Sequence, residues 1–175
     1  MDEEKNRLVS VGRLCDIVAR LRGPGGCPWD EAQTHESLKP ACIEEVAEVL
    51  GGIDILRETG RAENLKEELG DLLLQVVFHA QLAQEKGLFS LEDVAQAAAD
   101  KMVRRHPHVF GDVTFDNLDE QLKTWEKIKR AEHTDADGKP QGLFDSLPAS
   151  LPPLTKAYRI HSKAARVGFT WPEDE

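Results

Sequence analysis

The chain has 175 residues, a length typical of one ordinary domain, with 40% hydrophobic and 31% charged residues, which argues against wholesale disorder. Its net charge of −10 argues against broad, non-specific binding of nucleic acid, which requires a basic surface. The three cysteines lack zinc-knuckle or redox spacing, no apolar run reaches about 18 residues, and the charged N-terminus does not resemble a signal peptide, so we expect a cytoplasmic protein.

Apolar residues repeat at intervals of three and four along the first half of the chain, a pattern that predicts amphipathic helices. The first helix would span Glu4–Arg22 and end at the glycines and proline that follow. The second would run from about Glu36 to Thr59, where Gly51-Gly52 predicts either a kink or the close packing of another backbone. After a C-cap at Gly60, the third would cover about Ala62 to Lys86 and, being the most apolar, should be central.

The second half of the chain shows weaker but similar periodicity. Residues 108–112 are expected to form a turn, and residues 133–141 have the composition of a mobile loop. Val113-Thr114-Phe115 is the one short strand candidate, so we predict an all-α bundle with four core helices and peripheral helices. Three further helices are predicted: from the N-cap Ser90 to about His106, from about Leu118 to Glu132, and from about Leu154 to Val167.

Two acidic pairs lie within the apolar pattern of the second and third predicted helices, Glu45 with Glu48 and Glu68 with Asp71. Residues three apart share a helix face, and the short connection at Gly60 makes the two helices antiparallel neighbours. The four carboxylates can therefore meet between the helices, where they would repel one another without a cation. Such an oxygen-only set suits Mg²⁺ or Mn²⁺ rather than Zn²⁺. The alternative is a solvated acidic face.

A basic patch and a tryptophan could serve a phosphorylated ligand. Lys101 and Arg105, four residues apart on one helix face, could neutralise a polyphosphate, or could simply form a basic helix C-terminus favoured by the helix dipole. Trp125 could stack on a base while Lys129 reaches a phosphate or sugar; the alternative is a core tryptophan with a solvated lysine. The sequence contains no Walker-type phosphate loop and no Gly-x-Ser-x-Gly elbow.

An ordered series of motifs resembles the MazG family of all-α nucleoside triphosphate pyrophosphohydrolases. Glu44-Glu45-x-x-Glu48 is followed, after nineteen residues, by Glu68-x-x-Asp71. The resemblance runs from about residue 8 to residue 171. The other matching blocks include Gly-Gly-Cys-Pro-Trp-Asp at 25–30, Gln-Val-Val-Phe-His-Ala at 75–80, Arg-Arg-His-Pro-His-Val-Phe at 104–110, Trp125-Glu126-x-x-Lys129, and Val167-Gly168-Phe169-x-Trp171.

The resemblance implies a bundle that dimerises through its central helices, with Mg²⁺ at the acidic cluster; the oxygen-only ligands leave Mn²⁺ as a possible substitute. It implies hydrolysis of ribo- or deoxynucleoside triphosphates to monophosphate and pyrophosphate, a housecleaning activity. Glu44 or Glu45 would orient the attacking water or accept its proton. The implied ligands are Glu45, Glu48, Glu68 and Asp71 for the metal, Lys101 and Arg105 for the triphosphate, and Trp125 and Lys129 in the nucleotide pocket.

Members of this type usually carry a second, similar domain after the block that ends near Trp171, where this chain stops. The chain could therefore be a catalytically weak nucleotide-binding or dimerisation domain. A separate alternative keeps the fold and changes the substrate, as in a hydrolase specific for dUTP, dCTP or phosphoribosyl-ATP. Neither a membrane nor a nucleic-acid polymer is expected as a partner. We expect a MazG-like catalytic domain at 1–132, a mobile linker at 133–153, and a C-terminal helix and tail at 154–175.

Overall fold

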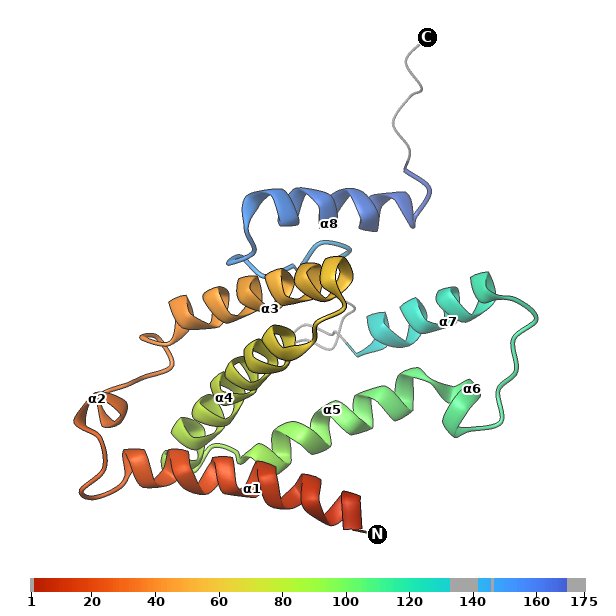
Figure 1. Cartoon of the computed structure of the whole chain (residues 1–175). Helices are drawn as coiled ribbons and strands as arrows, with labels where there is room; N and C mark the ends of the chain where they lie inside the picture. The colour runs from red at the N-terminus through yellow and green to blue at the C-terminus, as the bar shows by residue number, and fades with distance from the viewer. Residues whose placement is uncertain (1, 133–141, 146, 170–175) are drawn as a thin grey trace. The chain divides into compact units, whose positions relative to one another are not determined.

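The computed structural model describes residues 2–132, 142–145 and 147–169, and in these ranges the regular structure is entirely helical (Figure 1). The all-α prediction is confirmed. None of the helices in these ranges is long and apolar enough to cross a membrane. The helices are α1 (Asp2–Arg22), α2 (Pro28–Glu31), α3 (Lys39–Thr59), α4 (Glu63–Glu85), α5 (Leu91–Arg105), α6 (Pro107–Phe110), α7 (Leu118–Ala131) and α8 (Pro153–Ala165).

The chain divides into two compact units, Met1–Ala98 and Ala99–Glu175, and the boundary falls inside α5. The first unit therefore contains α1 to α4 with the start of α5, and the second contains the rest. The predicted division at 132/133 and at 153/154 stays a prediction. Its proposed mobile loop, residues 133–141, lies outside the described part of the chain.

In the unit Met1–Ala98, α3 and α4 lie side by side, and α1 packs against α4 (Figure 1). The core forms where α1 meets the C-terminal half of α4. Val18 of α1 is fully buried there, and Phe78 of α4 and Leu38, just before α3, are nearly so. Leu91, at the start of α5, packs against the same cluster. Each fully buried aliphatic or aromatic side chain contributes about 1.5–3 kcal/mol, so this cluster anchors one end of the helix pair.

The start of α3 differs from the prediction, because the helix begins at Lys39 rather than near Glu36. Pro40 occupies its first turn, where the missing N–H breaks no helical hydrogen bond. Before it, the Thr34 N–H donates to Ser37 Oγ at 2.9 Å, and the Ser37 N–H donates to Thr34 Oγ1 at 3.1 Å. These reciprocal bonds favour turns over helix in this segment.

The two glycines inside α3 have different surroundings, although the helix continues through both. A Cβ on Gly52 would lie 2.9 Å from Leu65 Cα, so the predicted close packing of another backbone is confirmed there. A Cβ on Gly51 would meet nothing within 4 Å. At the helix end, Gly60 has φ 72° and its N–H donates to Leu56 O at 2.8 Å, which confirms the predicted C-cap.

Substituting Gly52 with Ala should destabilise the protein, because the added methyl group would press on the backbone of Leu65 rather than on a flexible side chain. We expect the free energy of unfolding to fall by about 1–3 kcal/mol. The matched control is Gly51→Ala, whose added methyl group meets open space. This substitution should raise the free energy of unfolding by about 0.5–1 kcal/mol, because alanine has the higher helix propensity. Urea unfolding measures both changes. Equal effects of the two substitutions would contradict a tight contact between α3 and α4.

The structure confirms one predicted feature after α4 and differs from two others. The capping box at the start of α5 is confirmed, since the Ser90 N–H donates to Asp93 Oδ2 at 2.8 Å and the Asp93 N–H donates to Ser90 Oγ at 3.2 Å. Part of the predicted turn at 108–112 instead belongs to the single-turn helix α6. Residues 113–115 are not a strand.

Candidate functional site

Acidic side chains from α3 and α4 come together between the two helices. Glu45, Glu48 and Glu68, called here the carboxylate cluster, each offer an oxygen, and these oxygens lie within 4.8 Å of one another. The short connection at 60–62 makes the helices antiparallel, and the contact at Gly52 brings their backbones close. Glu45 and Glu68 are half-buried, whereas Glu48 is exposed. The structure thus brings together three of the four predicted metal ligands.

The other two acidic residues singled out in the sequence lie close by. Asp71, the fourth predicted ligand, is one helical turn beyond Glu68 on α4, is half-buried, and is not a member of the carboxylate cluster. Glu44 is exposed on α3 next to Glu45. The roles of Asp71 as a ligand and of Glu44 or Glu45 as the proton acceptor stay predictions.

Neutral amide groups hold two members of the carboxylate cluster. Asn64 Nδ2 donates to Glu68 Oε1 at 2.7 Å, and Gln75 Nε2 donates to Glu45 Oε1 at 3.4 Å. Among the described residues, no lysine, arginine or histidine forms an ion pair with any of the three carboxylates. Three like charges without a basic partner produce a local negative potential that favours a cation.

The chemistry of the carboxylate cluster fits a hard divalent cation. All of the atoms that it offers to a metal are carboxylate oxygens, the ligands that Mg²⁺ and Mn²⁺ prefer. Mg²⁺ keeps several waters and needs only a few carboxylates from the protein, so a partly exposed cluster suits it. A zinc site would instead include histidine or cysteine. The residues present therefore fit Mg²⁺ or Mn²⁺.

The predicted substrate-binding residues lie in the unit Ala99–Glu175. The Arg105 guanidinium carbon is 5.6 Å from the Trp125 ring centroid, and Lys129 Nζ is 4.8 Å from the same centroid. Both distances are those of cation–π contacts. Lys101 is exposed on α5 and takes no part in these contacts. The structure therefore places two of the predicted substrate-binding residues, Arg105 and Lys129, over the ring of a third, Trp125.

Glu132 is a member of this group that the sequence did not point to. Its carboxylate accepts hydrogen bonds from Arg104 Nε at 2.8 Å and from Arg105 Nε at 2.9 Å, and it also pairs with Arg105 Nη2 at 2.5 Å. Burial raises the pKa of Glu132, but the hydrogen bonds from Arg105 and Arg104 outweigh it and lower the pKa overall. Arg105, with 12% of its side chain exposed, is thus already bound to a carboxylate.

The surroundings of Lys129 carry an excess of positive charge. Burial lowers the pKa of Lys129 below its ordinary value, and Glu126 opposes this shift. The neighbouring Lys163, Arg159 and Arg105 lower the pKa further. Clustered cations that destabilise one another's charge favour a bound anion, so this region is suited to a phosphorylated ligand.

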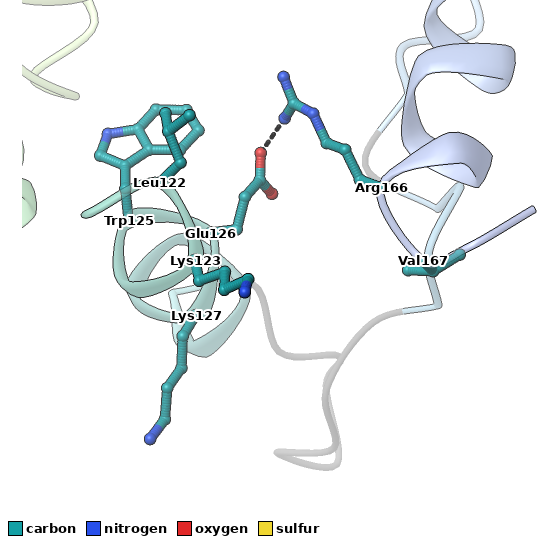
Figure 2. A pocket seen from close by; sticks show the side chains of 7 residues that line it. All are labelled: Leu122, Lys123, Trp125, Glu126, Lys127, Arg166 and Val167. Atoms are coloured by element: carbon teal, nitrogen blue, oxygen red, sulfur yellow. Dashed lines mark hydrogen bonds and ion pairs between the residues drawn. The ribbon is translucent and has the colours of Figure 1, made fainter. Parts of the chain in front are cut away.

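Two cavities open beside Trp125 within this unit. One has a volume of about 470 Å³ and the other about 300 Å³, both in the range of small-molecule sites. Figure 2 shows the larger cavity, where Glu126 of α7 and Arg166 at the end of α8 point toward each other and form an ion pair. Trp125 lines both cavities, whereas Lys101 and Lys129 are not among their lining residues.

A second polar group lies next to the carboxylate cluster in the unit Met1–Ala98. The rings of His35 and His79 are stacked with centroids 5.1 Å apart, and their Nδ1 atoms are 2.8 Å apart, within hydrogen-bond distance. His79 Nε2 is 3.4 Å from Cys42 Sγ, and the Cys42 thiol donates to Gln75 Oε1 at 3.7 Å. Burial, and then the charge of His35, lower the pKa of His79. No motif in the sequence indicates this group.

The lowered pKa of His79 predicts a pH dependence of stability. The folded state disfavours protonation of His79. Its contribution to the free energy of unfolding is therefore complete above its ordinary pKa of 6.5, and is lost as the pH falls through the pKa of the folded state. We expect wild type to lose more unfolding free energy than His79→Gln between about pH 7.5 and about pH 5.5, measured by urea unfolding. An equal loss in both proteins would contradict the shift.

Comparison with known proteins places the chain in a family. Residues 33–110 match the MazG nucleotide pyrophosphohydrolase domain. Over 162 residues the chain is 46% identical to the nucleoside triphosphate pyrophosphohydrolase of Escherichia coli K12, covering 92% of this chain and 59% of that protein. It is also 46% identical over 162 residues to the nucleoside triphosphate pyrophosphohydrolase/pyrophosphatase MazG of Thermotoga maritima, covering 93% of this chain and 59% of that relative. The chain thus spans 59% of the length of these curated relatives.

A solved structure shows the same relationship. The crystal structure of a mazG-related protein from Thermotoga maritima superposes with a TM-score of 0.52 at 33% sequence identity. The match covers 67% of this chain and 97% of that protein. The sequence and the fold agree, and the chain belongs to the MazG nucleotide pyrophosphohydrolase family.

Proposed function

We propose that the chain is a Mg²⁺-dependent nucleoside triphosphate pyrophosphohydrolase that converts NTP or dNTP and water to the monophosphate and pyrophosphate. The observation that carries the proposal is the convergence of Glu45, Glu48 and Glu68 without a basic partner among the described residues. The names of the two 46% identical relatives support the reaction. We place the housecleaning activity in the cytoplasm, where nucleotide pools reside and where the three free cysteines stay reduced.

The metal ligands in this proposal are the carboxylate cluster together with Asp71. The cluster would hold Mg²⁺, or Mn²⁺ in its place, and Asp71 would add a further oxygen from the next turn of α4. When bound, the ion supplies charge neutralisation for the phosphate oxygens and lowers the pKa of a water molecule. Glu68 and Glu45 also accept hydrogen bonds from the amides of Asn64 and Gln75.

The chemical step in this proposal is attack of a water oxygen on the α-phosphorus. The bond from the α-phosphorus to the oxygen shared with the β-phosphorus breaks, and pyrophosphate leaves with that oxygen. Glu44 or Glu45 would orient the water and accept its proton, since one carboxylate is exposed and the other half-buried. If Glu45 binds the metal through its carboxylate, Glu44 would be left as the proton acceptor.

The proposed contacts to the substrate rest on the cationic and aromatic group of the unit Ala99–Glu175. Trp125 would stack on the base, and Lys129 would reach a phosphate or sugar. Lys101 and Arg105 would neutralise the negative charge of the triphosphate and of the leaving pyrophosphate. Lys101 is exposed, while Arg105 would have to exchange its bonds to Glu132 for bonds to phosphate.

We also propose that the chain forms a homodimer through α3 and α4. These helices expose large apolar side chains, including Ile43 at 66%, Leu50 at 58% and Leu69 at 49%. Large apolar side chains exposed on two neighbouring helices favour an interface with another copy of the chain. Sedimentation velocity should give the mass of a dimer, and a monomer at all concentrations would contradict this part of the proposal.

A substrate panel with product analysis tests the reaction. The purified chain is incubated with the common NTPs and dNTPs, and with phosphoribosyl-ATP, in Mg²⁺ and in EDTA. The proposal predicts monophosphate and pyrophosphate in Mg²⁺ only. Turnover of dUTP, dCTP or phosphoribosyl-ATP alone would indicate a dedicated hydrolase, and binding without turnover would indicate a nucleotide-binding domain. Diphosphate and inorganic phosphate as products would contradict the proposed site of attack.

A further inference from the structure

A continuous series of hydrogen bonds leads from two histidines to a member of the carboxylate cluster. It begins with the 2.8 Å contact between the Nδ1 atoms of His35 and His79 and the 3.4 Å contact from His79 Nε2 to Cys42 Sγ. It continues from Cys42 Sγ to Gln75 Oε1 at 3.7 Å and from Gln75 Nε2 to Glu45 Oε1 at 3.4 Å. All five side chains are partly buried and belong to the unit Met1–Ala98.

The donors and acceptors in this series can be assigned from its carboxylate end. Glu45, when ionised, only accepts, so Gln75 must turn its NH₂ group toward it. The carbonyl oxygen of Gln75 then faces Cys42 and accepts from its S–H. The Cys42 sulfur, its one proton used, accepts from His79 Nε2–H, which leaves His79 Nδ1 to accept from His35.

This assignment requires a proton on His79 Nε2, which in the neutral ring leaves Nδ1 as an acceptor. Burial, and then the charge of His35, lower the pKa of His79 and so favour the neutral ring. The orientation of the Gln75 amide is therefore fixed at both of its ends, by Glu45 and by Cys42.

We propose that Gln75 is a positioning residue for Glu45, and that the Cys42 thiol holds the Gln75 amide in the required orientation. The inference rests on the proposed function, because it concerns how one metal ligand is oriented. A ligand held by a fixed outer partner loses less freedom when it binds an ion. Losing such a partner typically weakens metal binding about 10–100-fold.

Calorimetric titration of the full chain with Mn²⁺, without substrate, tests this role. Gln75→Leu keeps a side chain of similar size but loses the donor, so Mn²⁺ should bind about tenfold more weakly. The matched control is Gln84→Leu, at an exposed position of the same helix, which should bind Mn²⁺ like wild type. Urea unfolding of each variant verifies that it is folded.

Variants of Cys42 test the same proposal even if the Gln75→Leu variant fails to fold. Cys42→Ala removes the donor to Gln75 Oε1 and should weaken Mn²⁺ binding in the same direction. Cys42→Ser keeps an O–H donor and should restore binding to that of wild type. If Cys42 had a purely structural role, Cys42→Ala and Cys42→Ser would bind Mn²⁺ with the same affinity.

The outcomes separate this inference from the proposed function. Wild-type chain that binds no Mn²⁺ would overturn the carboxylate cluster as a metal site, and both proposals with it. Normal Mn²⁺ binding by wild type together with unchanged binding by Gln75→Leu and Cys42→Ala would overturn the positioning role alone. Weaker binding by Gln75→Leu and Cys42→Ala, with restoration by Cys42→Ser, supports it.

Discussion

Replacing Glu48 with Gln should reduce pyrophosphate release by this chain at least about a hundredfold in kcat/KM. The substitution keeps the size of the side chain and removes one of the three charges that lie within 4.8 Å of one another. A divalent ion held by fewer carboxylates binds more weakly and neutralises the phosphates less effectively. A continuous assay of pyrophosphate at several Mg²⁺ concentrations measures the loss, which high Mg²⁺ should partly reverse.

The same substitution should leave the fold intact. Glu48 is exposed, and removing its charge relieves repulsion within the carboxylate cluster. Without metal, the thermal midpoint of Glu48→Gln should therefore equal or exceed that of wild type. The matched control is Glu67→Gln, at an exposed position of α4 outside the cluster, which should retain full activity. Equal activity of the Glu48 and Glu67 variants would refute the metal-binding role.

Replacing Arg22 with Ala should cause the largest loss of stability, about 2–4 kcal/mol in unfolding free energy. Its side chain, only 7% exposed, forms two hydrogen bonds of 2.8 Å with Glu85 of α4. It also donates to Asp30 O at 2.5 Å and Gln33 O at 3.3 Å, and its guanidinium lies 5.4 Å from the Phe78 ring centroid. One residue thus ties the end of α1 to α4 and to the segment around α2.

The loss in Arg22→Ala follows from the groups that would be left without partners. Glu85 would lose the hydrogen bonds from Arg22 that lower its pKa, and the backbone carbonyls of Asp30, Glu31 and Gln33 would lose a charged donor. The matched control is Arg20→Ala on the same helix, because Arg20 is exposed and donates a hydrogen bond of 3.0 Å to Pro24 O. Urea unfolding should show a small change for Arg20→Ala. Comparable losses in both variants would contradict a specific role of Arg22.

Helical periodicity is the signal that allows part of the site to be predicted from sequence. The spacing of three within each acidic pair puts two carboxylates on one helix face, and the short connection at Gly60 folds the second pair back onto the first. The pair Gly51-Gly52 predicts a kink or a close helix contact, and only the structure shows that the contact is at Gly52. Such local rules are sufficient for the all-α fold and for three members of the cluster.

The partners of these residues could not be predicted, because they depend on tertiary distances. Gln75, on α4, follows Glu45 by thirty positions, and Glu132, just after α7, follows Arg105 by twenty-seven, so no local pattern relates them. Amide side chains such as Asn64 also carry no charge that would mark them as partners of an acid. The single-turn helices α2 and α6, four residues each, are too short to display a period.

The most direct measurement of where the catalytic ion binds is anomalous scattering from crystals of the chain soaked with Mn²⁺. If Glu45, Glu48 and Glu68 hold the divalent ion on which hydrolysis depends, the anomalous difference map has a manganese peak among their carboxylate oxygens. The peak should be lost in Glu48→Gln crystals soaked at the same concentration. No peak at the carboxylate cluster in wild-type crystals, with hydrolysis still dependent on divalent metal, would contradict the proposed site.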